Sequence, residues 1–589
     1  MSEKYEVAHY KVENLLTHIM TNEIVVPEIQ RPFVWSDKQV RDLIDSLYNG
    51  YPTGYLIMWQ NPNVRLKNGE SSGGKKILID GQQRVTALMT AIVGRKILTA
   101  NYREKVIRIA FNPVAKNDDE RFAVTSTMHI DSKIWIEDIS KIFAPGFSSR
   151  KFINQYLSDN PAADEDEVEN SLIKLSEIKN CPLGVIKLKA DLEISEVTEI
   201  FVRINSQGKR LNEADFAMSK IAANGTHNGV ILRKTIDYFC RLISDSAFYS
   251  RLESGDAEFM ASDFSQKISW LKNGVENIYS PDYSDMLRVS FMNAFNRGKV
   301  SVLVDLLSGR DFVSRTFKEE IADKSFADLS TGIKNFVSEY NFKNFILAIK
   351  AAGFVTPKLL NSQMTLDFAY TLYLILQRGS EIPKTEIKRY VQKWFVLSTL
   401  TGRYTASPES QMDRDLREIE AKGFKNFFEE NALIFSDETF WDVTIAQKLE
   451  TSSIASPYFN VYVAAQIFFG DHALLSNTIR VENLITIAGD IHHIFPKDYL
   501  KSHGRTSTLY NQIANYAYLD TTVNISIGKS APREYFAKAR ENFEALEKNL
   551  EENCIPREIF EMTHEDYGKF LERRRALMAK KIQRYYEKL

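Results

Sequence analysis

The stretch GDIHHIFPKDYL, residues 489–500, places two histidines side by side ahead of two apolar residues and a proline. The chain has only nine histidines among its 589 residues, so the adjacent pair His492 and His493 needs an explanation. Two asparagines, Asn515 and Asn524, follow in the next stretches of sequence, and each carries an amide oxygen that can bind a metal ion. The chemistry that uses these four side chains determines the fold that we expect for the C-terminal part of the chain.

Two adjacent histidines suit the hydrolysis of a phosphodiester bond, which needs both a base and a metal ion. Histidine is the side chain whose pKa allows it to take a proton from water near neutral pH. A divalent ion stabilises the charge that develops on the phosphate, and Mg²⁺ uses few protein ligands while keeping several waters. Adjacent side chains of a strand point to opposite faces, so a bend or bulge must bring both to one site. We therefore expect one histidine to serve the water and the other to serve the metal.

This region resembles the HNH, or His-Me finger, nucleases, in which an acidic residue or histidine precedes histidine, two apolar residues and proline. The resemblance implies a ββα-metal domain in which His493 is the general base and His492 and Asn524 are metal ligands. It further implies that Asn515 orients the base or braces the loop, and that Lys529 contacts DNA phosphate. The expected ion is Mg²⁺ or Mn²⁺, but His492 stands where aspartate is frequent, so the identity of the metal stays open; imidazole tolerates Mn²⁺ or Ni²⁺ as readily as Mg²⁺. A lone histidine before apolar residues is usually a core residue, but the complete pattern favours the nuclease interpretation.

A second candidate site lies in ILIDGQQRVTAL, residues 77–88, where a predicted strand, a tight turn and a predicted helix follow one another. The start of a helix presents unpaired N–H groups and a positive dipole end, which suit a phosphate. Gly81 permits close approach of the backbone, and Arg84 can fork onto phosphate oxygens. Asp80 can hold a metal ion or orient a water molecule. The structural alternative is an ordinary capped helix with a surface arginine.

Together with VPEIQRPFVWSDKQV (26–40) and FVRINSQGKRLNEADF (201–216), the DGQQR segment resembles the N-terminal domain of the GmrSD-type modification-dependent, type IV restriction proteins. That domain is similar to the ParB/sulfiredoxin fold, and the stretch 401–416 also resembles what lies between the two domains of this family. The resemblance implies hydrolysis of GTP, ATP or CTP, with catalytic roles for Asp80 and Arg84. The implied nucleotide-binding residues are Asp80, Gly81, Gln82, Gln83, Arg84, Asn205 and Gly208.

The IQRPFVW stretch corresponds, by the same resemblance, to the part of the family that senses modified DNA. Gln30, Arg31, Phe33 and Trp35 are therefore the candidate DNA-binding residues of this domain. Relatives that sense phosphorothioate carry a tyrosine where this chain has Ile29, so the modification that is sensed stays open. The alternative for Phe33 and Trp35 is that they are core residues.

The remaining sequence predicts a multidomain α+β protein. In the first 225 residues we predict strands at 24–29, 53–60 and 77–80 and helices at 36–50 and 84–94. In the helix 36–50, Ser36 is the expected N-cap, and an apolar stripe is formed by Val40, Leu43, Ile44 and Leu47. Helical patterns dominate from 226 to 440, for example at 384–400, and their aromatic residues are expected to form a core. We accordingly predict three domains, with boundaries 1–225, 226–440 and 441–589.

Charge and composition limit the ways in which the chain can bind nucleic acid. Hydrophobic residues make up 44% and charged residues 26%, which is typical of a soluble globular protein. The net charge is −2 and the isoelectric point is about 6.6, so DNA binding would use local patches rather than an overall positive charge. An acidic surface segment is expected at 164–169. The basic segment 573–588 is either a solvated helix face or a helix that contacts the DNA backbone.

Other sequence features favour a cytoplasmic protein without a membrane partner. No apolar run approaches the roughly 18 residues of a spanning helix, and the N-terminus lacks the pattern of a secretory signal. Cys181, Cys240 and Cys554 are far apart and form neither a disulfide framework nor a zinc-binding spacing. The oligomeric state stays open, a homo-oligomer included.

The combined hypothesis is a phage-defence endonuclease that cleaves modified double-stranded DNA. Binding or hydrolysis of a nucleoside triphosphate in the N-terminal domain would shift the nuclease between closed and competent states. One alternative is a DNA- or partner-binding protein whose HNH site is inactive. The other is an NTP-driven toxin that cleaves RNA.

Overall fold

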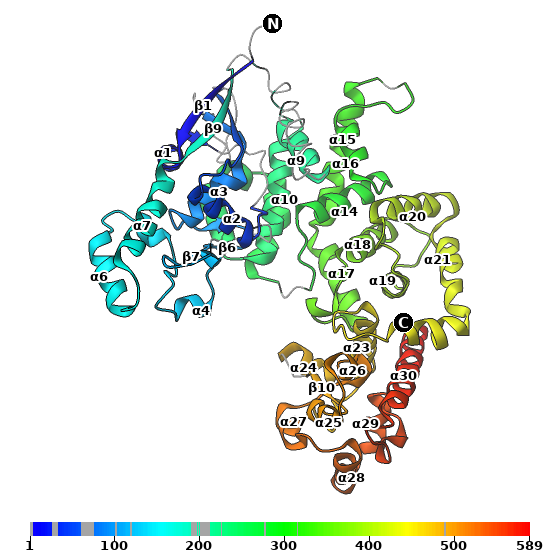
Figure 1. Cartoon of the computed structure of the whole chain (residues 1–589). Helices are drawn as coiled ribbons and strands as arrows, with labels where there is room; N and C mark the ends of the chain where they lie inside the picture. Colours follow the sequence, from blue (N-terminus) through cyan, green and yellow to red (C-terminus); the bar gives the residue numbers. More distant parts are fainter. Residues whose placement is uncertain are drawn as a thin grey trace. The chain divides into compact units, whose positions relative to one another are not determined.

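The computed structural model describes residues 4–25, 33–60, 76–99, 103–117, 120–189, 192, 197, 200, 213–224, 227–275, 278–314, 316–487 and 491–589. These residues form two compact units, Met1–Ala261 and Ser262–Leu589 (Figure 1). Both strands and helices occur in each unit, as expected for an α+β protein of several domains. The boundaries expected near residues 225 and 440 stay predictions.

A mixed five-stranded sheet organises the N-terminal unit. Its strand order is β1 (Tyr5–Lys11), β9 (Pro182–Leu188), β3 (Tyr55–Gln60), β4 (Lys76–Asp80) and β2 (Ile24–Val25). Strand β9 is antiparallel to β1 and parallel to β3, whereas β4 is antiparallel to β3 and parallel to β2. The predicted strands 53–60 and 77–80 are thus confirmed. The predicted strand at 24–29 begins as expected, and its remaining residues lie outside the described part of the chain.

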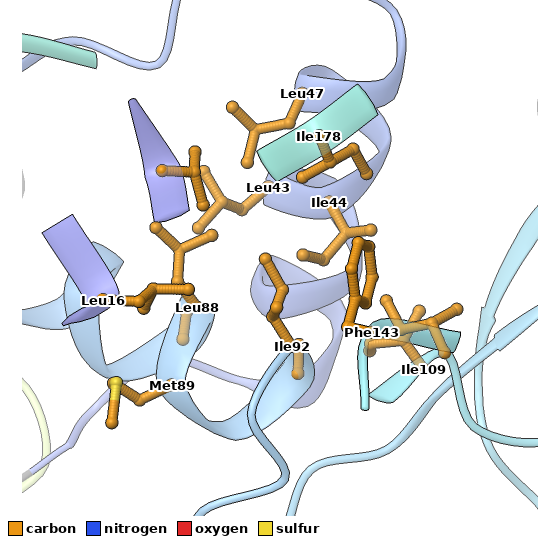
Figure 2. Packing of buried hydrophobic residues seen from close by; sticks show 14 of the residues in the cluster. Leu16, Leu43, Ile44, Leu47, Leu88, Met89, Ile92, Ile109, Phe143 and Ile178 are labelled. Carbon is orange, nitrogen blue, oxygen red and sulfur yellow. The ribbon is translucent and has the colours of Figure 1, made fainter. Parts of the chain in front are cut away.

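Helix α2 (Asp37–Tyr48) lies in the hydrophobic core that also contains Leu56, Met58 and Leu78 of the sheet, and its position follows from its sequence. Ser36 accepts a hydrogen bond from the backbone of Gln39, whose side chain accepts one in return, so both partners of a capping box are present. The predicted apolar stripe is buried, and Figure 2 shows Leu43, Ile44 and Leu47 packed near Leu88 of α3 (Gln82–Ala91) and Ile92, the residue that follows this helix. The helices predicted at 36–50 and 84–94 are therefore confirmed.

The acidic segment 164–169 is the beginning of a helix. Asp164 caps α7 (Glu165–Ser176) by accepting a hydrogen bond from the backbone of Glu167, and the first turn of this helix carries three acidic residues. Negative charge at a helix N-terminus is stabilised by the helix dipole, so this segment has a structural explanation.

Shorter elements complete the N-terminal unit. They are α1 (Val12–Met20), β5 (Ile97–Leu98), β6 (Glu104–Lys105), β7 (Ile109–Phe111), β8 (Phe122–Val124), α4 (Thr127–Ile130), α5 (Ser140–Phe143), α6 (Ser149–Asp159), η2 (Glu177–Asn180), α9 (Glu213–Ala223), α10 (Gly229–Ser244), α11 (Phe248–Gly255) and α12 (Ala257–Met260).

The C-terminal unit begins with a helical region. Its elements up to residue 469 are α13 (Asp263–Ile268), η3 (Ser269–Asn273), α14 (Tyr283–Phe295), α15 (Val300–Leu307), α16 (Glu319–Phe336), α17 (Glu339–Ala351), η4 (Pro357–Leu359), α18 (Gln363–Arg378), α19 (Ile387–Thr401), α20 (Pro408–Lys422), α21 (Phe424–Ala432), η5 (Leu433–Ser436), the π-helix η6 (Phe440–Ile445), α22 (Ala446–Lys448) and α23 (Pro457–Phe469). Helix α19 confirms the helix predicted at 384–400. Fully buried aromatic residues such as Tyr370 and Trp394 confirm the expected aromatic core.

The last part of this unit combines two short strands with helices. Its elements are α24 (Val481–Ile487), β10 (Ile491–His493), α25 (Lys497–Ser502), α26 (Ser507–Tyr510), η7 (Ile513–Asn515), β11 (Tyr516–Tyr518), α27 (Thr521–Ile527), α28 (Pro532–Asn542), α29 (Leu546–Glu552), η8 (Arg557–Phe560) and α30 (Tyr567–Lys588). Within the described ranges, none of the helices of the protein combines the length and the apolar character that a bilayer-spanning helix needs.

A cluster of charged side chains is buried between α14 and α18. Arg288 donates to Asp367 Oδ2 at 2.6 Å and to Asp285 Oδ1 at 3.1 Å, and the Tyr279 hydroxyl donates to Asp367 Oδ1 at 2.9 Å. Here two buried carboxyl groups face a single guanidinium. Burial, reinforced by the neighbouring Asp367, raises the pKa of Asp285 to about 7. At pH values between the unfolded and the native pKa of Asp285, the native protein therefore keeps a proton on this carboxyl that the unfolded chain has lost.

This raised pKa predicts how stability changes with pH. Because the native state binds the extra proton, the contribution of Asp285 is fully present below its unfolded pKa and is lost as pH rises through about 7. We expect the urea midpoint of the helical region to fall between about pH 5 and about pH 8, and Asp285→Asn to reduce that slope. If the urea midpoint fell equally steeply with pH in the wild type and in Asp285→Asn, this assignment of the raised pKa would be contradicted, whatever the absolute midpoints.

Candidate functional site

The two adjacent histidines lie on a two-stranded hairpin. Strand β10 pairs antiparallel with β11, and His492 lies opposite Ala517 while His493 lies opposite Tyr516. Successive side chains of a strand point to opposite faces. His492 is accordingly directed inward and is only 3% exposed, whereas His493 is half-buried. The hairpin therefore gives the two imidazoles different surroundings, as two different chemical tasks require.

His492 meets Asn524 of helix α27. Its Nδ1 lies 2.5 Å from Asn524 Oδ1, and its Nε2 is buried without a hydrogen-bond partner. The amide oxygen can only accept, so the proton of the neutral ring lies on Nδ1 and the lone pair on Nε2. Burial lowers the pKa of His492 to about 4, so the ring is neutral near pH 7. Neutral imidazole is the form that binds a metal ion.

His493 is held by polar and aromatic neighbours. Its Nε2 lies 3.0 Å from Asn511 Oδ1, and its ring packs edge-on against Tyr516 at a centroid distance of 5.0 Å. Burial lowers the pKa of His493, and the charge of Lys497 acts in the same direction, while the hydrogen bond to Asn511 opposes them. The ring is therefore kept in the neutral form that can accept a proton.

Asn515 braces the backbone around the two histidines. Its side chain is fully buried and accepts from Phe495 N at 2.8 Å, while Nδ2 donates to Phe495 O at 3.1 Å and to Tyr510 O at 3.3 Å. Its own carbonyl accepts from Ile494 N at 2.8 Å. Of the two roles expected for Asn515, these contacts support bracing of the loop rather than direct contact with the His493 ring.

Helix α30 supports the opposite side of the hairpin through a buried arginine. Arg574 is fully buried, and its guanidinium donates to the carbonyls of Ala514, Tyr516 and Asn553 at 2.7–3.3 Å. The basic segment 573–588 was expected to be a solvated face or a DNA-contacting helix. For Arg574 neither expectation holds, because its N–H groups donate to buried backbone carbonyls of η7, of the first residue of β11 and of the residue after α29.

The contacts of Arg574 predict a strong effect on stability. Arg574→Met would remove the side-chain donor from the buried carbonyls of Ala514 and Tyr516, while Asn553 O keeps the Tyr462 hydroxyl, and we expect the free energy of unfolding to fall by about 3 kcal/mol. Its neighbour Arg573 is partly exposed and pairs with Glu558, so Arg573→Met is a matched control that should change stability by less than about 0.5 kcal/mol. Urea unfolding measures both variants, and equal losses would contradict the proposed support of β11.

Lys529, the residue expected to contact phosphate, follows the candidate metal ligand Asn524 in the sequence. Lys529 is exposed just after α27, on the same segment as Asn524. Among the described residues, no three His, Cys, Asp or Glu side chains come together as a metal-binding group. A metal ion at His492 would therefore depend on an amide oxygen, water and substrate for its other ligands.

The DGQQR segment forms the expected strand, turn and helix. Gly81 has φ of +97°, and a Cβ atom at this position would lie 2.2 Å from Leu56 Cδ2, so both the conformation and the close packing require glycine. Arg84 Nη2 donates to Asp80 Oδ2 at 3.2 Å, and Nη1 donates to Thr53 O at 3.0 Å. Two of the residues expected to bind nucleotide are thus paired with each other, while Gln82 is half-buried at the start of α3.

Gln83 connects the DGQQR segment to the predicted DNA-sensing segment. Its Oε1 accepts from Val34 N at 2.8 Å. Phe33 is only 5% exposed and belongs to the core, and Trp35 packs against that core while partly buried. For Phe33 the structure favours the core alternative over contact with DNA. The other predicted residues, Gln30, Arg31, Asn205 and Gly208, lie outside the described part of the chain.

Three residues that support the histidines or the backbone around them were not found by sequence reasoning. Asn511 contacts His493 but lies outside the motif that the HNH resemblance uses. Arg574 was considered only as one charge in a basic segment, although an arginine on the apolar face of an amphipathic helix is a signal of burial. Tyr535 was also missed, and its hydroxyl donates to Ile494 O at 2.7 Å.

Comparison with known proteins supports the N-terminal resemblance. Residues 12–222 match the family model described as GmrSD restriction endonuclease, N-terminal domain. An uncharacterized protein of Methanocaldococcus jannaschii, MJ0686, is 22% identical to this chain, and the alignment covers 97% of each protein. The family match ends before the histidine hairpin. The N-terminal part of this chain is therefore similar to the N-terminal domain of a family of restriction endonucleases.

Proposed function

We propose that this protein is a metal-dependent DNA endonuclease of phage defence, regulated by a nucleoside triphosphate. The observation that carries the proposal is the hairpin of β10 and β11. It combines a half-buried neutral imidazole at His493 with a buried His492 that faces an amide oxygen of Asn524. The similarity of residues 12–222 to a restriction-endonuclease domain supports DNA as the substrate.

In the proposed reaction His493 acts as the general base. Its ring takes one proton from a water molecule, and the resulting hydroxide attacks the phosphorus atom of a phosphodiester. One P–O ester bond then breaks, the leaving oxygen takes a proton from solvent to become an alcohol, and His493 releases the proton that it took, so that one water is consumed for each bond cleaved. The burial that lowers the pKa of His493 keeps its ring unprotonated and ready to accept near neutral pH.

His492 and Asn524 would hold a divalent cation, Mg²⁺ or Mn²⁺. The residues fit this role because the neutral ring directs Nδ1 at the amide oxygen of Asn524, so that two ligand atoms already lie side by side; the Nδ1 proton would be absent in the metal-bound form. A neutral imidazole and an amide oxygen are both ligands that these ions accept. When bound, the cation would stabilise negative charge on the phosphate and on the leaving oxygen. Exposed Lys529 would contact a neighbouring phosphate.

The nuclease assignment is tested by replacing His493 in the full-length protein. We expect His493→Ala to lower cleavage of phage DNA by about 100-fold or more in Mg²⁺ or Mn²⁺, and chelation of the metal to abolish cleavage by the wild type. The exposed His503 lies in the same unit, and His503→Ala should cleave at the wild-type rate. Unchanged cleavage by His493→Ala would overturn the assignment. RNA offered beside DNA separates an RNase toxin from a DNA endonuclease.

The N-terminal unit would couple the nucleotide to the recognition of modified DNA. The supporting contact is the hydrogen bond from Val34 N to Gln83 Oε1, which links the DGQQR helix to the segment expected to sense DNA. The start of α3 would bind phosphate through its N–H groups and through Arg84, after that guanidinium releases Asp80. A nucleotide that changes this pairing would change the position of the sensing segment. The triphosphate is GTP, ATP or CTP.

This coupling predicts nucleotide-dependent discrimination between modified and unmodified DNA. We expect the wild type to cleave DNA that carries one of three modifications (glucosylated hydroxymethylcytosine, methylcytosine or phosphorothioate) in preference to unmodified DNA, and only with one of the three triphosphates. Arg84→Met should remove the nucleotide response, whereas Arg95→Met, an exposed arginine beyond the same helix, should keep it. Equal cleavage of both DNAs at every nucleotide concentration would contradict the coupling.

A further inference from the structure

The side chain of Asn511 reaches the imidazole to which we assign the role of general base. Asn511 Oδ1 lies 3.0 Å from His493 Nε2, which is hydrogen-bond distance for a ring N–H donor. A neutral imidazole carries one N–H and one lone pair, so the partner of one nitrogen determines which atom is left to act as a base. The contact therefore bears directly on the chemistry of the ring.

An amide oxygen can accept a hydrogen bond but cannot donate one. With Oδ1 of Asn511 facing Nε2, the proton of His493 lies on Nε2 and the lone pair lies on Nδ1. If the proton moved to Nδ1, that nitrogen would have no lone pair and could not take a proton from the water. Asn511 thus selects the tautomer through a single contact.

The backbone holds Asn511 where this contact requires it. Its N–H donates to Ser507 O at 3.1 Å, at the end of helix α26. The preceding carbonyl, that of Tyr510, accepts from Asn515 Nδ2 at 3.3 Å and from the Tyr567 hydroxyl at 3.2 Å. The residue that orients the base is therefore fixed by the same network that braces the hairpin.

Two tyrosines restrict the plane of the His493 ring. Tyr516 lies at a centroid distance of 5.0 Å and an interplanar angle of 78°, and Tyr510 lies at 6.1 Å and 68°. These edge-on contacts limit rotation of the ring, but they are nonpolar and do not distinguish one nitrogen from the other. The hydrogen bond to Asn511, by contrast, distinguishes the two flipped orientations of the ring.

We propose that Asn511 is a positioning residue that holds His493 with its proton on Nε2, so that Nδ1 faces the reacting water. This inference rests on the proposed nuclease function and adds to it a residue that lies outside the HNH motif. Asn511 does not touch the substrate in this account. It acts only through the imidazole.

Two substitutions of nearly equal size separate this role from a merely structural one. Asn511→Asp keeps an acceptor oxygen at the same place, whereas Asn511→Leu removes the acceptor and keeps the volume. We expect Asn511→Leu to lower kcat about 10- to 100-fold with little change in KM, and Asn511→Asp to restore most of the rate. Gln512→Leu is the control, because that side chain donates to Thr508 O instead.

The ring itself gives a readout that does not depend on catalysis. In the metal-free wild type with ¹⁵N-labelled histidine, the signals lost in His493→Ala identify the ring, and we expect Nε2 to be protonated and Nδ1 to carry the lone pair. A proton on Nδ1, full activity of Asn511→Leu, or equal losses of kcat in the Asp and Leu variants would each overturn the proposal. If the wild type does not cleave DNA, the proposed function fails, while the tautomer measurement still decides whether Asn511 positions the ring.

Discussion

The candidate site depends on side chains that satisfy the backbone of a very small hairpin. Strands β10 and β11 have three residues each, and an isolated ribbon of this size is not stable in water. Free carbonyls and N–H groups in and beside these strands are satisfied by side chains from outside the sheet. Asn515 pairs with the backbone of Phe495, Tyr535 donates to Ile494 O, and Arg574 donates to the carbonyls on both sides of Asn515. Because unpaired backbone groups are costly when buried, these three side chains make the hairpin possible.

A rigid hairpin of this kind gives two neighbouring histidines distinct properties. His492 points inward, where burial lowers its pKa and leaves one nitrogen without a partner, while His493 stays half-exposed with a side-chain acceptor on the other face. A buried imidazole with an unsatisfied nitrogen costs free energy. The arrangement is thus less favourable for stability alone than an apolar pair would be, which is expected of a functional site.

Much of the fold around the two sites could be predicted from local sequence. The capping box of Ser36 and the apolar stripe of α2 are local features, and so are the strand, glycine turn and helix around Gly81. The histidine and asparagine pattern likewise identified residues that the hairpin brings together. The contacts of Asn511, Arg574 and Asp285 could not be predicted, because each depends on partners that are distant in sequence and on burial that charge alone does not reveal. Phe33 illustrates the same limit, since an aromatic residue in a motif can equally be part of the core.

The central claim is that His492 and Asn524 hold a divalent cation beside the base at His493. The most direct measurement is anomalous diffraction from crystals of the full-length protein grown with Mn²⁺ and a short DNA duplex that resists hydrolysis. A manganese peak is expected in contact with His492 and Asn524, with a DNA phosphate on the ion and the His493 ring facing that phosphate. Manganese bound elsewhere while the DNA phosphate lies far from His493, or a hairpin that binds neither ion nor DNA, would contradict it.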